Sequence, residues 1–201
     1  MTDIFLLQPP IPEQVRPFRK ETILCPPLGL SYVASTLLSH EFDVKMMDFA
    51  IMDADICDVE AETRRQSPKI VAISTTTNTY KNALKSAKVS KEVDSDVITV
   101  LGGPHVTFTP NETLTHPEID IVVRHEGEYT MVELCDVLLR GAGDIRRING
   151  VSYRRNNQIV NNPPRPSIED LDRLPFPARH LLPMSLYKIP GSLITLSLIH
   201  I

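Results

Sequence analysis

Hydrophobic positions along the first 140 residues form short apolar runs that alternate with helical patterns. Five runs are rich in β-branched residues and show little alternation with polar residues, which is typical of strands covered on both faces. They predict strands over residues 4–7, 44–47, 70–73, 97–101 and 119–123.

Helical stripes lie between several of these strands. Apolar residues at i, i+3, i+4, i+7 and i+8 predict one helix around Leu30–Leu38 and another around Met131–Leu139. A weaker pattern predicts a helix over residues 54–66, and Tyr80, Ala83, Leu84 and Ala87 predict another. Lysines 81, 85, 88 and 91 share a different face of that second helix, which is expected to be solvated. Strands joined by such crossovers predict an α/β fold, a flavodoxin-like doubly wound five-stranded parallel sheet of strand order 2-1-3-4-5.

The pattern changes after residue 140. Residues 151–153 and 158–160 flank Asn156-Asn157 and predict a β-hairpin. Residues 163–190 hold seven of the 17 prolines and are expected to form an extended linker, neither helix nor core. We therefore divide the chain into a flavodoxin-like domain (1–142), a hairpin extension (143–162) and a proline-rich linker with the start of a further element (163–201).

Composition narrows the class of protein. With 21 basic and 25 acidic residues the net charge is −4, which gives no general attraction to nucleic acid or anionic membranes. Cysteines at 25, 57 and 135 are too far apart for a zinc knuckle or a disulfide framework, and their sparse use fits a reducing compartment. The N-terminus lacks the basic region of a signal peptide, and no apolar stretch approaches roughly 18 residues, so we expect a cytoplasmic protein without a membrane span.

Special residues follow four of the predicted strands. Pro9-Pro10 follows the first, Ser74–Thr77 the third, Gly102-Gly103 the fourth and Glu126-Gly127 the fifth. Open parallel sheets bind ligands at the carboxyl ends of their strands. Glycines let a ligand approach the backbone closely, and hydroxyls offer uncharged donors and acceptors. The sequence therefore predicts a ligand site at this edge.

Several common chemistries lack their motifs. There is no GxGxxG, GxxxxGK[ST] or GxSxG, and the six histidines show no metal-ligand spacing. We therefore predict neither a metal site nor a catalytic residue, although His105 and His125 could face a ligand. Asp48 ends the second strand as a phosphoacceptor would, but a receiver domain normally has an acidic pair where this chain has Gln8-Pro9-Pro10. Cys25 is interpreted as a structural thiol.

An ordered set of motifs then carries a family resemblance. The segments are Pro26–Leu30, Leu101–His105, Glu126–Glu128, Ile148–Tyr153, Asn162–Arg165, Ile168–Asp172 and Leu174–Ala178. In this order and spacing the chain resembles, from about residue 3 to about residue 190, the N-terminal part of cobalamin-binding radical S-adenosylmethionine proteins. That family includes methyltransferases and the anaerobic ring cyclase of bacteriochlorophyll synthesis.

The resemblance implies a cobalamin site at the carboxyl edge of the sheet. The contacts that it implies are Pro10, Leu28, Gly29, Ser74, Thr75, Thr76, Gly102, Gly103, Pro104, His105, Glu126 and Gly127. The DxHxxG loop with which other cobalamin enzymes ligate cobalt is absent after the first strand, so the resemblance implies no histidine ligand and an open or water-bound lower face. The family often has glycine where this chain has His125, so the loop after the fifth strand is expected to differ in shape.

The resemblance also implies a longer enzyme. In the family the linker leads into a (β/α) barrel whose CxxxCxxC motif holds a four-iron four-sulfur cluster that binds S-adenosylmethionine. This chain reaches an apolar run at 193–196 and ends at Ile201 without that motif. We expect it to be the cobalamin-binding module of a methyltransferase, unable to perform radical chemistry alone. A flavodoxin-like domain that binds a flavin or another small ligand without catalysis remains the alternative.

Overall fold

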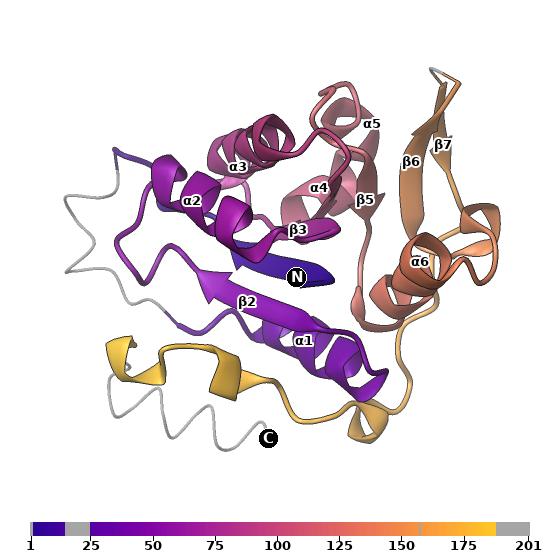
Figure 1. Cartoon of the computed structure of the whole chain (residues 1–201). Helices are drawn as coiled ribbons and strands as arrows, with labels where there is room; N and C mark the ends of the chain where they lie inside the picture. The colour runs from indigo at the N-terminus through magenta and orange to yellow at the C-terminus, as the bar shows by residue number, and fades with distance from the viewer. Residues whose placement is uncertain (1, 15–24, 157, 188–201) are drawn as a thin grey trace.

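The structure, a computed structural model, describes residues 2–14, 25–156 and 158–187. Its centre is a seven-stranded sheet of order β2-β1-β3-β4-β5-β6-β7 (Figure 1). The first five strands are parallel, and β6 and β7 are antiparallel additions. The predicted 2-1-3-4-5 order is confirmed. The strands are β1 Ile4–Gln8, β2 Val44–Asp48, β3 Ile70–Ser74, β4 Ile98–Gly102, β5 Ile121–Val123, β6 Val151–Arg155 and β7 Gln158–Asn161.

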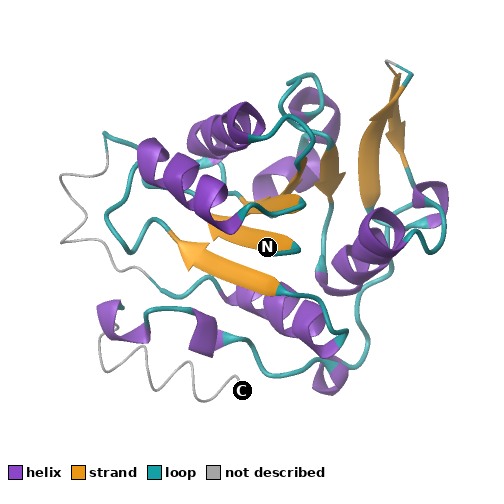
Figure 2. Ribbon diagram, viewed as in Figure 1, coloured by secondary structure: helices purple, strands orange, loops and turns teal. Residues whose placement is uncertain are grey.

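Helices cover both faces of the parallel sheet, as the continuous apolar strands predict (Figures 1 and 2). Ile4 and Leu6 of β1 belong to the core under α1 and α6, whereas Phe5 and Leu7 belong to the core under α2 and α3. This alternation is the two-residue period of a strand buried on both sides. The helices are α1 Leu28–Ser39, α2 Ile56–Gln66, α3 Tyr80–Val93, α4 Pro104–Phe108, α5 Pro110–Thr113 and α6 Glu128–Arg140.

The two short helices α4 and α5 fill the crossover between β4 and β5, where the sequence pattern predicts none. Each begins at a proline, whose fixed φ suits the first helical position. Five and four residues are too few for a helical stripe to show in the sequence.

The predicted hairpin continues the main sheet. β6 pairs with β5, with Ile121 opposite Tyr153, and β7 pairs with β6. A boundary between this extension and the preceding domain near residue 142 stays a prediction.

The proline-rich stretch does not behave as a bare linker. Residues 163–187, here named the return segment, run back along α1 and β2 (Figure 1). The backbone N–H of Ala178 donates to the carbonyl of Ser31 at 3.0 Å, and Ala178, Leu182 and Tyr187 are buried in the core under α1. The expectation that this stretch contributes no core is therefore wrong, because proline prevents regular helix without preventing side chains from packing. Residues 188–190 and the apolar run at 193–196 lie outside the described residues.

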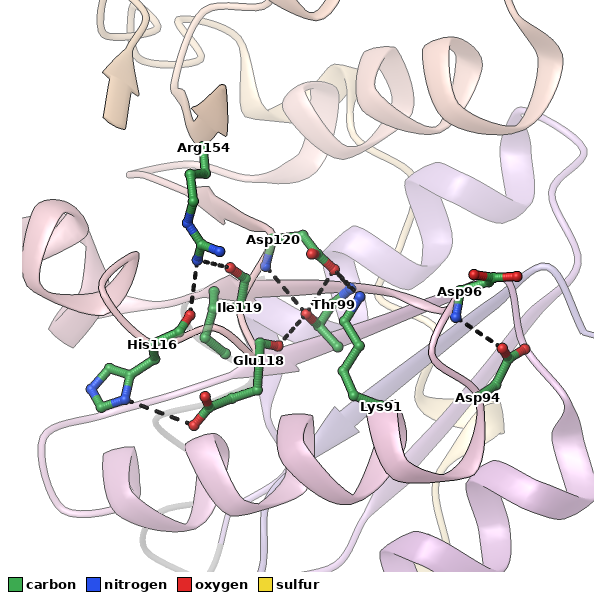
Figure 3. A network of polar contacts seen from close by, with 9 residues as sticks. All are labelled: Lys91, Asp94, Asp96, Thr99, His116, Glu118, Ile119, Asp120 and Arg154. Atoms are coloured by element: carbon green, nitrogen blue, oxygen red, sulfur yellow. Dashed lines mark hydrogen bonds and ion pairs between the residues drawn. The ribbon is translucent and has the colours of Figure 1, made fainter. Parts of the chain in front are cut away.

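A polar network closes the opposite, amino-terminal edge of the sheet (Figure 3). Arg154 on β6 donates through Nη2 to the carbonyls of Leu114, His116 and Ile119, each at 2.9 Å. Lys91 Nζ lies 2.7 Å from Asp120 Oδ2, which also accepts the Thr99 hydroxyl. Lys91 is thus an ion-pair partner as well as part of α3's lysine face, whereas Lys81, Lys85 and Lys88 are exposed as expected.

Candidate functional site

An open cavity of about 540 Å³ lies at the carboxyl edge of the sheet, under the first turns of α1 and α6. Its inner wall is apolar and comes from alternate strand residues and the two helices: Leu6, Val33, Ala72, Val100, Val123 and Met131. Its polar groups follow the strand ends: Gln8, Asp48, Ser74, Thr76, His125, Glu126 and Glu128. An apolar interior with a few polar groups at its rim is the usual form of a small-molecule site.

The structure brings most of the sequence-predicted residues together at this cavity. Nine line it: Leu28, Gly29, Ser74, Thr76, Gly102, Gly103, Pro104, Glu126 and Gly127. They come from α1 and from the ends of β3, β4 and β5, the carboxyl edge at which the sequence predicts a ligand site. Their contact with a ligand stays a prediction.

Three of the predicted residues lie outside the cavity lining and support its loops instead. Thr75 is fully buried, and its N–H donates to the carbonyl of Gly102 at 2.9 Å. The carbonyl of Pro10 accepts a hydrogen bond from the Asn82 amide at 3.0 Å.

His105 is the third of them. Its ring lies against Tyr80, with ring centroids 4.2 Å apart, and Nδ1 lies 3.2 Å from the Thr77 hydroxyl. The imidazole is therefore held beside α3 by its neighbours.

The glycines of the site serve different needs. Gly103 has a φ of +104°, and a Cβ there would lie 2.4 Å from the carbonyl oxygen of Thr75. Glycine is thus required by the approach of two backbone segments, and the space freed by its missing side chain does not go to a ligand. A Cβ on Gly29 would meet nothing within 4 Å, so Gly29 faces open space at the cavity.

Asp48 ends β2 as a buried carboxyl on the cavity wall. Its Oδ1 accepts the N–H groups of Ala50 and Ile51 at 2.9 and 3.3 Å, and its Oδ2 accepts the Tyr187 hydroxyl at 2.8 Å. Burial, together with the negative charge of Asp48, raises the pKa of Tyr187 well above its ordinary value, so the hydroxyl stays a donor.

The loop after β5 supplies two further polar residues. His125 adopts a left-handed φ of +61°, and its N–H donates to the Thr107 hydroxyl at 3.0 Å. That conformation favours glycine, which explains the frequent glycine that the family resemblance suggests here. Glu126 Oε2 accepts the N–H of Ile168 at 2.6 Å and so ties the return segment to the cavity loop.

Glu128 differs from its neighbours. Its Oε2 is buried and has no hydrogen-bond partner among the described residues. Desolvation by burial, with a smaller contribution from the charge of Glu126, raises the pKa of Glu128.

A model of the B12 binding domain matches residues 22–135, more than half of the chain. The chain belongs to the B12-binding domain family.

Curated relatives of this B12-binding domain are longer proteins. An uncharacterized methyltransferase, PH0819 of Pyrococcus horikoshii, is 41% identical over 189 residues, which cover 94% of this chain and 40% of the relative. The anaerobic magnesium-protoporphyrin IX monomethyl ester cyclase of Rubrivivax gelatinosus is 34% identical over 154 residues, which cover 74% of this chain and 28% of the relative. The chain thus spans less than half the length of these relatives and corresponds to their N-terminal region.

Solved structures share the fold. The cobalamin-dependent S-adenosylmethionine radical enzyme OxsB, solved with aqua-cobalamin and S-adenosylmethionine bound, superposes with a TM-score of 0.73 at 19% identity, over 89% of this chain and 24% of that one. The radical S-adenosylmethionine methyltransferase TsrM of Kitasatospora setae, with cobalamin and a [4Fe-4S] cluster bound, gives 0.67 at 18% identity, over 87% of this chain and 31% of that one.

Sequence reasoning missed two acidic residues of the B12-binding domain's cavity. Asp48 stands at a strand end, which is a usable signal, but its position there suggests only a phosphoacceptor. Glu128 stands inside the Glu126–Glu128 motif, and only the structure shows that its Oε2 has no hydrogen-bond partner among the described residues. Within the described ranges, no three His, Cys, Asp or Glu side chains gather as a metal site, and no helix is long and apolar enough to cross a membrane.

Proposed function

We propose that this B12-binding domain holds cobalamin at the carboxyl edge of its sheet and serves as the cobalamin module of a longer radical S-adenosylmethionine methyltransferase. One observation carries the proposal: the cavity coincides with the segment that matches the family. All its lining residues except Leu6 and Gln8 lie within residues 22–135.

The residues present fit the proposed ligand. Cobalamin joins a large ring that bears amide side chains to a nucleotide tail that ends in an apolar aromatic base. Leu6, Ala72 and Val100 offer an apolar wall on which such a base could lie. Ser74 and Thr76 offer hydroxyls that can donate to and accept from amides or a phosphate.

When bound, cobalamin supplies a cobalt atom that can accept and give up a methyl group. The chain's own residues bind and orient it. The apolar wall excludes water from the tail, and the strand-end hydroxyls fix its polar groups. The Tyr80 and Thr77 contacts of His105 keep that imidazole beside α3, which supports a site without a cobalt–imidazole bond to it. The iron–sulfur cluster and S-adenosylmethionine would belong to a barrel outside this chain.

The test is a titration of the purified protein with hydroxocobalamin, followed by visible spectroscopy and gel filtration. We expect the pigment to co-elute with the protein and its spectrum to lack the signature of histidine ligation. Retention of flavin mononucleotide instead, with no retention of hydroxocobalamin, would favour the flavodoxin-like alternative and overturn the proposal. His125→Ala is the matched variant for ligation, because His125 is the imidazole that lines the cavity, and it should leave the bound spectrum unchanged.

A further inference from the structure

Glu128 presents an unmet polar group to the cavity. It is the first residue of α6 and lines the cavity, and its Oε2 is buried without a hydrogen-bond partner among the described residues. Buried polar atoms are nearly always hydrogen-bonded, so an orphan on a cavity wall calls for a partner from outside the chain.

Hydrogen bonding to the backbone at Glu128 and Gly127 supports a carboxylate at Glu128, but it does not outweigh the cost of burial and the nearby charge of Glu126. The other titratable groups on the cavity wall are Cys25, Asp48, His125 and Glu126, and no lysine or arginine of the described residues lines it. Asp48 and Glu126 already accept hydrogen bonds from Tyr187 and Ile168. With a second carboxyl nearby and no lysine or arginine on the wall, the protonated form of Glu128 is favoured, in accord with its raised pKa.

We propose that Glu128 keeps its proton in the folded domain and donates it in a hydrogen bond to an uncharged acceptor of the ligand in the cavity. The inference rests on the proposed function in taking that ligand to be cobalamin. Cobalamin offers acceptors of this kind in two parts: the amide oxygens of its ring side chains, and its nucleotide, through the ribose hydroxyls or through a base nitrogen not bonded to cobalt. A neutral carboxyl suits either one, because it donates without bringing a buried charge to the site.

Two variants with side chains of similar length to glutamate separate the effect of the hydrogen-bond donor from the effect of side-chain volume. Glu128→Gln keeps an uncharged donor, whereas Glu128→Met removes it. At the acidic end of the pH range in which the domain stays folded, the dissociation constant for hydroxocobalamin should change less than about threefold in the glutamine variant and rise about tenfold in the methionine variant. Glu92→Met, at an exposed glutamate on α3, is the control and should bind as wild type does.

The pH dependence tests the protonation state. As the pH rises and Glu128 loses its proton, wild-type affinity should fall relative to that of Glu128→Gln. Comparing the two proteins at each pH cancels titration of the ligand and of the cavity groups whose charge does not act on Glu128. Affinity that rises with pH in wild type relative to the glutamine variant, or wild-type affinity in Glu128→Met, would overturn the inference.

Cobinamide, which lacks the nucleotide, distinguishes the two acceptors. If the methionine variant loses affinity for cobinamide as well, a ring amide accepts the proton of Glu128. If only cobalamin binding suffers, the acceptor belongs to the nucleotide.

A measurement on the free protein separates this inference from the proposed function. The ¹³C carboxyl resonance of Glu128, assigned by its loss in Glu128→Gln, should titrate above the ordinary glutamate pKa of about 4.3 and shift higher still with cobalamin bound. If Glu128 has an ordinary pKa and cobalamin still binds, the proposed hydrogen bond is refuted but the proposed function is not. If wild type fails to retain hydroxocobalamin, the proposed function and the hydrogen bond to it both fall.

Discussion

At the scale of single residues, Gly102, the last residue of β4, and Gly103, which follows it, have different structural roles. The backbone of Gly103 lies so close to Thr75 that a Cβ would meet its carbonyl at 2.4 Å, and its φ of +104° disfavours any other residue. A Cβ on Gly102 would lie 3.7 Å from the carbonyl of Val123, an ordinary contact. Gly103 is therefore needed for the chain to fold, whether or not it contacts a ligand.

We therefore expect Gly103→Ala to lower the free energy of unfolding by about 2–4 kcal/mol, through strained backbone and a steric collision. A larger side chain such as valine should prevent folding, so the variant would not isolate ligand binding. Urea unfolding followed by circular dichroism measures the loss. Gly102→Ala is the control and should change stability by less than about 1 kcal/mol; an equal loss in both variants would contradict the role of the Thr75 contact.

Gly29 offers the cleaner test of the cavity. Because a Cβ there meets nothing within 4 Å, a bulky side chain can be added at the cavity without disturbing the core. Gly29→Trp should weaken hydroxocobalamin binding at least about tenfold while urea unfolding stays near wild type, and Gly29→Ala should retain binding. Undiminished affinity in the tryptophan variant would remove the start of α1 from the site.

At the scale of elements, hydrophobic periodicity predicted the regular strands and helices but missed the packing of the irregular return segment. The five parallel strands and the helices α1, α2, α3 and α6 show as runs or stripes, because their burial follows the local geometry of strand or helix. The return segment buries Ala178, Leu182 and Tyr187 at irregular intervals among prolines, so its packing depends on the surface of α1 and β2. No local pattern in the sequence encodes that surface.

The hydrogen bond between Tyr187 and Asp48 fastens the return segment to β2. Tyr187→Phe keeps the ring but removes the donor to Asp48 Oδ2, and we expect it to lower the free energy of unfolding by about 1–2 kcal/mol. Tyr153→Phe is a matched control, because the Tyr153 hydroxyl is buried without a hydrogen-bond partner among the described residues. Its removal should be neutral or slightly stabilising, and an equal loss in both variants would contradict the specific role of Tyr187.

The pH dependence of that difference follows from the raised pKa of Tyr187. A group whose folded-state pKa is raised contributes stability below its unfolded pKa, about 10 for tyrosine, and loses it as the pH rises through the folded value. The stability difference between wild type and Tyr187→Phe should therefore be constant from neutral pH to about pH 9. A difference that shrinks within that range would indicate that the tyrosine ionises early.

At the scale of the whole molecule, the cavity is held by segments far apart in sequence. The return segment reaches it twice, through Ile168 at Glu126 and through Tyr187 at Asp48. A ligand on this wall would lie beside Glu126 and Asp48, the two cavity residues that hold the return segment. Binding should stabilise the return segment and the sheet together.

We expect hydroxocobalamin at a hundredfold excess over its dissociation constant to stabilise the domain by about 2.7 kcal/mol, seen as one cooperative shift in thermal unfolding. Gly29→Trp should show no such shift at the same concentration. Two separate transitions, with only one of them moved by the ligand, would show that the return segment and the sheet do not unfold as one cooperative unit.

The sequence predicted the region of the cavity more accurately than the individual residues that line it. Strand ends and glycines mark the carboxyl edge because topology alone brings them together. His105 follows a strand yet lies against Tyr80, and Thr75 is turned into the core, because neighbouring side chains decide the direction of each. Such choices depend on packing between elements, which no spacing along one chain expresses.

The course of the return segment also bears on how the sheet ends. β2 is the outer strand on its side, and the turn at Arg179–Leu181 lies against it. An uncovered outer strand offers free backbone groups to other molecules and promotes aggregation. A version of the protein cut after residue 162 would bare this strand together with the apolar patch that receives Leu182 and Tyr187. Light scattering should show that this shortened protein precipitates or self-associates, whereas the protein with residues 1–201 stays monodisperse. The proline-rich stretch would then protect the protein from aggregation.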